Sequence, residues 1–197
     1  MLAATLSQVA FALSYGWLSR MGPLRAFLVG AGAFATATVA LSFLHWSAVE
    51  TFLLVAASLL IGYLVIRGRV LEPPSEPNRL PRWDIPVRMA AATAVVVVIT
   101  TFAPDLGSHL AGLLSPFPVF AAVLAVFNHQ MHGAGAATQT LDGLVLGLLA
   151  PAVFFLVLAL TLGRVGLAAF AIATVAAFAA QAVTLLAIPR AQPPAAS

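Results

Sequence analysis

The stretch that decides the fold runs from Leu113 to Leu160 and reads LLSPFPVFAAVLAVFNHQMHGAGAATQTLDGLVLGLLAPAVFFLVLAL. Apolar runs flank a polar segment, residues 128–142, which carries one carboxylate, Asp142. A helix that crosses a membrane needs roughly twenty predominantly apolar residues, and these runs are typical of such helices. Helix breakers and polar side chains meet inside them, so we expect any functional site to lie here.

The composition of the whole chain also indicates a membrane protein. Of the 197 residues, 62% are hydrophobic and 8% are charged, with a mean hydropathy of +1.05. Soluble domains carry about 25% charged residues, and so few charges do not cover a water-soluble fold. The net charge of +3 comes from nine Arg without any Lys, which we interpret as topology determinants at helix ends and not as a nucleic-acid surface. The absence of Cys excludes disulfides and thiolate metal sites.

We predict an all-α, polytopic membrane helix bundle with seven transmembrane helices. The expected helices are 2–19, 25–43, 48–66, 85–103, a segment within 108–128, 136–161 and 165–188. We divide the chain into a three-helix membrane half, a Pro/Arg-rich cytoplasmic linker, a four-helix membrane half and a disordered tail, at residues 1–66, 67–83, 84–188 and 189–197.

The arginine residues predict the orientation of this bundle. Seven crossings place all but one of them on one face: Arg20, Arg25, Arg67, Arg69, Arg79, Arg82, Arg88 and Arg190. The other face collects Arg164 alone. Cytoplasmic loops carry an excess of basic residues, so we expect the N-terminus outside and the C-terminus in the cytoplasm.

Three further patterns concern helix packing. Residues 11–20 and 119–128 are both apolar helices that end in polar residues and precede a Gly-containing turn, which suggests a parallel repeat of helices one to three and five to seven. Gly30 and Gly32 are small residues of the kind that let membrane helices pack closely. Gln8 and Tyr15 are seven residues apart on one helix face, where we expect them to form hydrogen bonds inside the bundle.

The run LAGLLSPFPVFA at residues 110–121 resembles the start of a helix in the GlpM-like group of small bacterial inner-membrane proteins. A polar Gly-containing turn and a helix with an aromatic pair, here Phe154-Phe155, follow it as in that group. The resemblance covers residues 84–188 and implies a four-helix unit in a bacterial inner (cytoplasmic) membrane, without an established activity. The chain departs from the group where relatives carry an Arg, because here the helix has Gln139, Thr140 and Asp142.

The first candidate site is the segment Ser115-Pro116-Phe117-Pro118. Two prolines remove two backbone donors and leave carbonyls one turn earlier without helical partners. Such a break either helps to bind a substrate, as broken helices do in transporters, or simply marks where the fifth helix begins.

Asp142 is the second candidate, close to the N-terminus of its helix and on one face with Gln139 and Thr138. One interpretation is a proton or cation site in a bundle cavity. The alternative is an interface-level carboxylate that matches the helix dipole and pairs with a nearby arginine, for which Arg20, Arg25 and Arg88 are the candidates.

The third candidate is the polar group Asn128, His129, Gln130 and His132. One interpretation of this group is a gate or proton relay. The alternative is a polar cytoplasmic turn without a special role. The His-x-x-His pair lacks a third ligand other than Asp142, so we expect no metal and no cofactor. The sequence carries no soluble-enzyme motif, and we expect no enzymatic activity.

These residues lead to two functional hypotheses. The first is a small secondary permease, working as a homodimer, for an unknown small molecule or ion. Its expected substrate-binding residues are Asp142, Gln139, Asn128, Ser115, Pro116 and Pro118, with His129 and His132 in gating or proton relay. The second is a non-catalytic accessory or structural subunit of a larger membrane assembly. Both place the protein in the lipid bilayer without nucleic acid.

Overall fold

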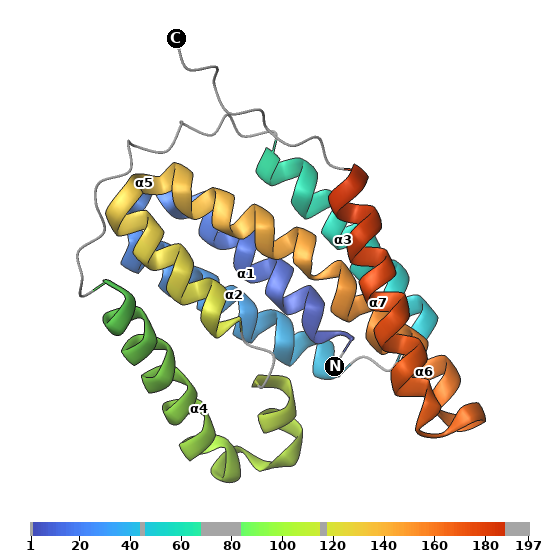
Figure 1. Cartoon of the computed structure of the whole chain (residues 1–197). Helices are drawn as coiled ribbons and strands as arrows, with labels where there is room; N and C mark the ends of the chain where they lie inside the picture. The colour runs from blue at the N-terminus through green and yellow to red at the C-terminus, as the bar shows by residue number, and fades with distance from the viewer. Residues whose placement is uncertain (1, 44–45, 68–83, 115–117, 188–197) are drawn as a thin grey trace.

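The computed structural model describes residues 2–43, 46–67, 84–114 and 118–187, and for residues 67, 84, 99 and 102–114 it describes the helical backbone alone. Every regular element in these ranges is helical (Figure 1). In chain order the elements are α1 (Ala4–Leu18), η1 (Ser19–Met21), α2 (Pro23–Ser42), α3 (Ala48–Arg67), α4 (Asp84–Leu114), α5 (Val119–Gly147), α6 (Leu149–Val165) and α7 (Ala168–Ala187). The predicted all-α class is confirmed.

Four helical stretches in the described ranges are long and apolar enough to cross a membrane. They are Pro23–Ser42, Ala48–Ile66, Val119–Val165 and Ala168–Leu186. The protein is therefore a multi-pass membrane protein by its apolar helices. Seven crossings stay a prediction. α1, for example, has 15 residues and is about 22 Å long, which is shorter than the roughly 30 Å hydrocarbon core that a crossing helix must span.

α5 reverses direction at Gly133. It consists of a first arm, residues 119–132, and a second arm, residues 134–147, joined where Gly133 has φ 82° and ψ −179° (Figure 1). This backbone conformation is open to glycine and to almost no other residue. The sequence predicted a Gly-containing turn between two helices here, and the structure confirms it.

The predicted sixth helix, 136–161, corresponds to the second arm of α5 followed by α6. Only Leu148 separates the two, and its φ of −70° and ψ of −14° are still helical. Pro151 has no N–H to donate to the carbonyl of Gly147, so one regular hydrogen bond is missing one turn before the proline.

The predicted end of the fourth helix at residue 103 is wrong. α4 continues through Pro104 to Leu114, and Figure 1 shows that it bends in its second half. A proline inside a helix removes one hydrogen bond and bends the helix without necessarily ending it. At the other end, Pro86 lies in the first turn, where its missing N–H costs nothing.

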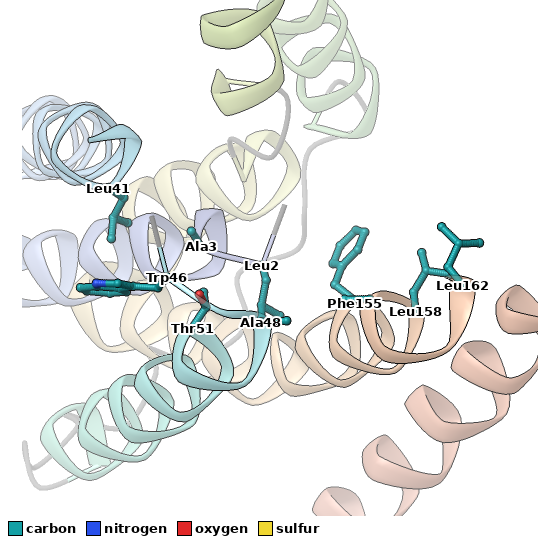
Figure 2. Close-up of a pocket in the computed structure, with 10 residues that line it drawn as sticks. Leu2, Ala3, Leu41, Trp46, Ala48, Thr51, Phe155, Leu158 and Leu162 are labelled. Atoms are coloured by element: carbon teal, nitrogen blue, oxygen red, sulfur yellow. The ribbon is translucent and has the colours of Figure 1, made fainter. Parts of the chain in front are cut away.

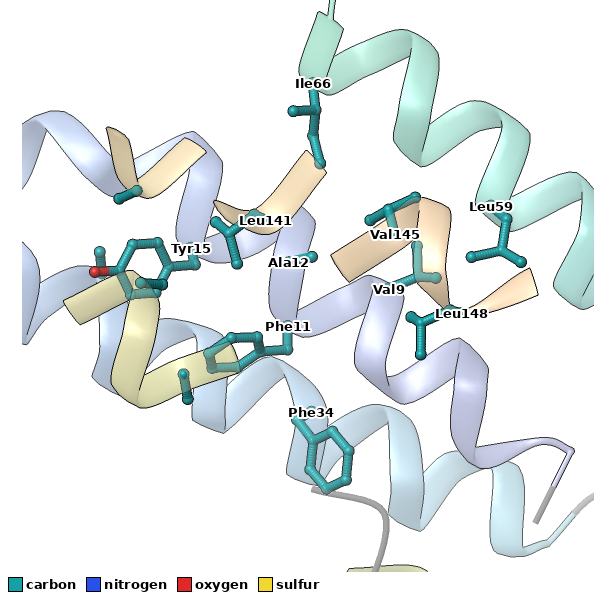
Figure 3. Packing of buried hydrophobic residues seen from close by; sticks show 14 of the residues in the cluster. Val9, Phe11, Ala12, Tyr15, Phe34, Leu59, Ile66, Leu141, Val145 and Leu148 are labelled. Atoms are coloured by element: carbon teal, nitrogen blue, oxygen red, sulfur yellow. The ribbon is translucent and has the colours of Figure 1, made fainter. Parts of the chain in front are cut away.

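The hydrophobic core surrounds α1, which contacts α2, α3 and α5. Phe11, Ala12 and Tyr15 are completely buried on α1, and Leu141 and Val145 of α5 pack against them (Figure 3). Residues from both sides of the linker thus contribute to one core. The helix positions follow from this packing, since in lipid close contact between side chains replaces the hydrophobic effect as the main driving force.

The two glycines expected to pack closely behave differently. A Cβ at Gly30 would lie 3.1 Å from ring carbons of Phe11, so this glycine lets α2 approach α1. Gly32 is exposed and has nothing within 4 Å of such an atom, so the expectation was right for Gly30 and wrong for Gly32. Gly62 of α3, which the sequence did not single out, lies close to Val9.

The start of α3 is closed by two reciprocal hydrogen bonds. The backbone N–H of Ser47 donates to Glu50 Oε2 at 2.9 Å, and the backbone N–H of Glu50 donates to Ser47 Oγ at 3.3 Å. This is the capping box of a Ser-x-x-Glu sequence, in which each side chain satisfies a free N–H of the first turn. The Ser-x-x-Glu spacing is the sequence signal of this helix start, and the sequence analysis did not use it.

Replacing Ser47 with alanine removes this cap. We expect the free energy of unfolding to fall by about 1 kcal/mol, measured by thermal unfolding of the purified protein in detergent. The control is Ser42→Ala, because Ser42 Oγ donates only to the carbonyl of Val39, 2.7 Å away, and caps no N–H. Equal stability of the two variants would contradict the role of Ser47.

α6 and α7 form a helical hairpin at the side of the bundle, where α7 contacts mainly α6 (Figure 1). α7 buries Ala169 and Ala173 and leaves Phe170, Val175 and Phe178 exposed. Apolar side chains on an outward face are expected in a membrane, where lipid is the surrounding solvent.

Candidate functional site

Polar side chains gather where α5 reverses. We define the reversal cluster as Tyr15, Arg88, Asn128, His129 and Thr140. α1, α4 and both arms of α5 contribute to it, and η1 also contacts α5 at this end of the bundle. Residues more than one hundred positions apart thus meet at one place.

Tyr15 and His129 form its buried part. The Oη atom of Tyr15 lies 3.2 Å from His129 Nδ1, a hydrogen bond between two side chains that are 0% and 9% exposed. The two rings meet edge to face with centroids 6.1 Å apart. The contact with the Tyr15 hydroxyl fixes the orientation of the imidazole ring.

A chain of hydrogen bonds runs through Asn128. Arg88 Nη1 donates to Asn128 Oδ1 at 3.2 Å, and Asn128 Nδ2 donates to Thr140 Oγ1 at 2.8 Å. The Thr140 hydroxyl in turn donates to the carbonyl of Ala136 at 3.0 Å. In these hydrogen bonds the Asn128 amide oxygen accepts and the amide nitrogen donates, which determines the orientation of the amide group. The bond from Asn128 to Thr140 joins the two arms of α5.

The guanidinium of Arg88 also lies over an aromatic ring. Its Cζ atom is 5.2 Å from the centroid of Phe127, a cation–π arrangement. The contact holds a partly buried positive charge beside Asn128. The cluster therefore presents hydrogen-bond donors, one imidazole and one cation at the helix reversal.

The other predicted residues of α5 are placed differently. Asp142 is partly buried on the second arm, and its Oδ1 atom is enclosed by protein. It lies nine residues beyond Gly133, about 13 Å along the helix. Gln139 is exposed, whereas Thr138 is buried, so the structure does not bring Gln139 into the cluster. His132 is half-buried and ends the first arm.

Of the proline segment, residues 115–118, the structure describes Pro118. Ser115 and Pro116 lie outside the described residues. Pro118 is buried and directly precedes α5, with φ −78° and ψ 62°. Its place at the start of a helix agrees with the architectural interpretation of the proline.

Sequence reasoning missed three contributions to the cluster. Tyr15 was expected to form hydrogen bonds in the bundle, but without its partner His129. Arg88 was considered only as a possible partner of Asp142, and its hydrogen bond to Asn128 was not foreseen. Thr140 was noticed only as a departure from relatives. The helical period predicts faces of one helix, whereas these pairs depend on how different helices meet.

Within the part of the chain that the structure describes, no group of three His, Asp or Glu residues is arranged to hold a metal ion. His129 Nδ1 is engaged with Tyr15.

Comparison with known proteins adds no assignment to this geometry. No family model, no curated protein and no solved structure matches the chain.

Proposed function

We propose that this protein is a small secondary permease in which the reversal cluster forms the polar part of the transport site. The observation that carries the proposal is the buried Tyr15–His129 pair beside the reversal at Gly133. In the proposed orientation this turn lies at the cytoplasmic end of the bundle, where helix ends leave backbone donors and acceptors available to a ligand. Asp142, deeper on the second arm, is the proposed second proton or cation site.

The geometry supports a proton-linked process. His129 is an exchangeable group near the reversal, and Asp142 provides a carboxylate about 13 Å from Gly133 along the same arm. Buried ionisable residues at membrane depth are costly and usually functional. A substrate with acceptor groups would meet the donors of Arg88 and Asn128, so we propose an anionic or strongly polar small molecule.

The proposed orientation is N-terminus outside and C-terminus in the cytoplasm, with seven crossings of a bacterial inner membrane. It is supported by the positions of Arg20, Arg25 and Arg88 next to the helix ends that surround the reversal. The resemblance of residues 110–121 to the GlpM-like group agrees with this address. A reporter active only outside the cytoplasm, fused at residue 75, should be silent, and an active fusion would overturn the orientation.

A second candidate function is that of an accessory subunit of a membrane assembly. The observation in its favour is the exposed Gly32 on α2, which offers a surface where another helix fits closely. Introducing Gly32→Leu tests this candidate, because the change leaves the monomer core untouched. We expect a co-purifying partner to be lost if the protein is an accessory subunit.

The permease proposal is tested by ligand-induced stabilisation. The purified protein is heated with a panel of small anions, polar metabolites and ions at several pH values. Ligand at a hundredfold excess over Kd raises the free energy of unfolding by about 2.7 kcal/mol. We expect a stabilising compound for the wild type, and we expect Asp142→Asn and Tyr15→Phe to lose its effect.

The matched control is Gln139→Ala, which changes an exposed polar residue on the same arm. It should retain the stabilisation in full. The stabilising compound is then used in uptake measurements with reconstituted vesicles at two external pH values. Uptake that is unchanged in Asp142→Asn and in Tyr15→Phe would refute the proposed site.

A further inference from the structure

A second cavity lies away from the reversal cluster, between the start of α1, the start of α3 and the second half of α6 (Figure 2). Its volume is about 400 Å³. Leu2 and Ala3 form one side, Trp46 and Thr51 another, and Phe155 and Leu162 stand opposite on α6 (Figure 2). None of these residues belongs to the proposed transport site.

The lining leaves little for a polar ligand to bind. Thr51 is the one lining residue with a hydroxyl, and Thr51 Oγ1 already donates to the carbonyl of Ser47 at 2.9 Å. The remaining lining side chains are aliphatic or aromatic, and Trp46 adds one indole N–H at the edge. An apolar cavity of this kind selects an apolar occupant.

Polar groups mark one end of the cavity as the membrane surface. Trp46 is 43% exposed and directly precedes the capping box of Ser47 and Glu50. On the opposite wall, Arg164 lies two residues after Leu162. It is exposed and places a positive charge in the last turn of α6. Tryptophan and arginine are typical of the interface, where the indole lies at headgroup level and the guanidinium meets phosphate.

We infer that this cavity binds one acyl chain of a membrane phospholipid, with its headgroup between Trp46 and Arg164. The chain lies along Leu2, Phe155 and Leu158, and the phosphate lies within reach of the Arg164 guanidinium. The site adds a contact between the start of α1 and α6, whose protein neighbours include α3, α5 and α7. It is independent of the proposed transport activity.

The test uses tryptophan quenching in the full-length protein. The chain has three Trp residues, so Trp17→Phe with Trp83→Phe leaves Trp46 alone, and Trp46→Phe with Trp83→Phe leaves the 67% exposed Trp17 as control. Phosphatidylglycerol with brominated acyl chains is titrated into protein in detergent. We expect saturable quenching of Trp46 at an equimolar ratio and only a gradual, unsaturated decrease for Trp17.

Filling the cavity provides the decisive comparison. Ala159 lines it and is exposed, so Ala159→Phe occupies the space without disturbing the core. This variant should lose most of the saturable quenching of Trp46 while its unfolding temperature stays unchanged. Ala3→Leu fills the same cavity from α1 and keeps the test open if the first variant does not fold.

Arg164→Gln distinguishes the headgroup contact from the acyl site. It should weaken binding of brominated phosphatidylglycerol more than binding of brominated phosphatidylcholine. Superimposable quenching curves for Trp46 and Trp17, or full quenching of Trp46 in both filled variants, would overturn the inference, because they would indicate exchange with surrounding lipid alone.

Discussion

Gly133→Ala is expected to reduce the stability of the protein by about 1–3 kcal/mol, because a side chain is strained in the backbone conformation of this residue. Gly133 has φ 82° and ψ −179°, and the two arms of α5 meet at this residue. Relief of the strain requires the arms to rotate relative to each other. That rotation pulls Asn128 away from Thr140, whose hydrogen bond of 2.8 Å joins the arms. The loss therefore extends from the turn to the reversal cluster.

Gly143→Ala is the matched control for this change. Gly143 lies on the second arm, is exposed and has nothing within 4 Å of an added Cβ. Alanine is favoured over glycine inside a helix by about 1 kcal/mol, so this variant should be slightly more stable than the wild type. Thermal unfolding followed by circular dichroism in detergent compares the two. A Gly133→Ala protein as stable as Gly143→Ala would mean that the chain does not reverse at residue 133.

Gly30→Leu is expected to destabilise the contact between α1 and α2 by about 1–3 kcal/mol, the usual cost of overfilling a packed core. A Cβ at this position would lie 3.1 Å from two ring carbons of Phe11 and 3.3 Å from its carbonyl oxygen. Phe11 is 0% exposed and has no free space for its ring. The helices must therefore separate, and Tyr15, one turn further along α1, moves with them. We expect ligand-induced stabilisation to weaken together with thermal stability.

Gly32→Leu, two residues away on the same helix, is the control. Gly32 is exposed, and an added Cβ has nothing within 4 Å. Its unfolding temperature in detergent should equal that of the wild type, so any effect of Gly32→Leu in the membrane reports a contact with another molecule. Equal destabilisation by both leucines would contradict the packing of α1 against α2.

Several elements of the fold were predictable from residue type alone. The limits of α2 and α3 differ from the expected 25–43 and 48–66 by no more than two residues at either end, because each apolar run has the length of one crossing and ends at polar or helix-breaking residues. The Gly-containing turn in the polar segment was also predicted, since only glycine adopts its conformation readily. Pro104 and Pro151 did not fix the limits of the fourth and sixth predicted helices, because a proline bends or interrupts a helix depending on what packs around it.

The candidate site was predicted in part. Asn128 and His129 were identified because polar residues inside apolar runs are costly and need partners. Which partners they have depends on contacts between distant helices, and the sequence offered several. The structure placed Tyr15 on His129 and Arg88 on Asn128, and it left Gln139 exposed although Gln139 had been expected beside Asp142.

By itself, the sequence determined that this is an all-α membrane protein, because 62% hydrophobic residues with 8% charge can be covered only by lipid and a lipid-embedded backbone must satisfy its own hydrogen bonds. It also determined where α2 and α3 start and that a Gly-containing turn follows the polar residues 128–132, since these depend on neighbouring residues. Only the tertiary structure decided that α1 lies at the centre, that Gly30 and not Gly32 is a packing contact, and that Tyr15 meets His129. These features depend on the rotation and register of one helix against another, and many combinations of Ala, Val and Leu faces satisfy the same apolar pattern.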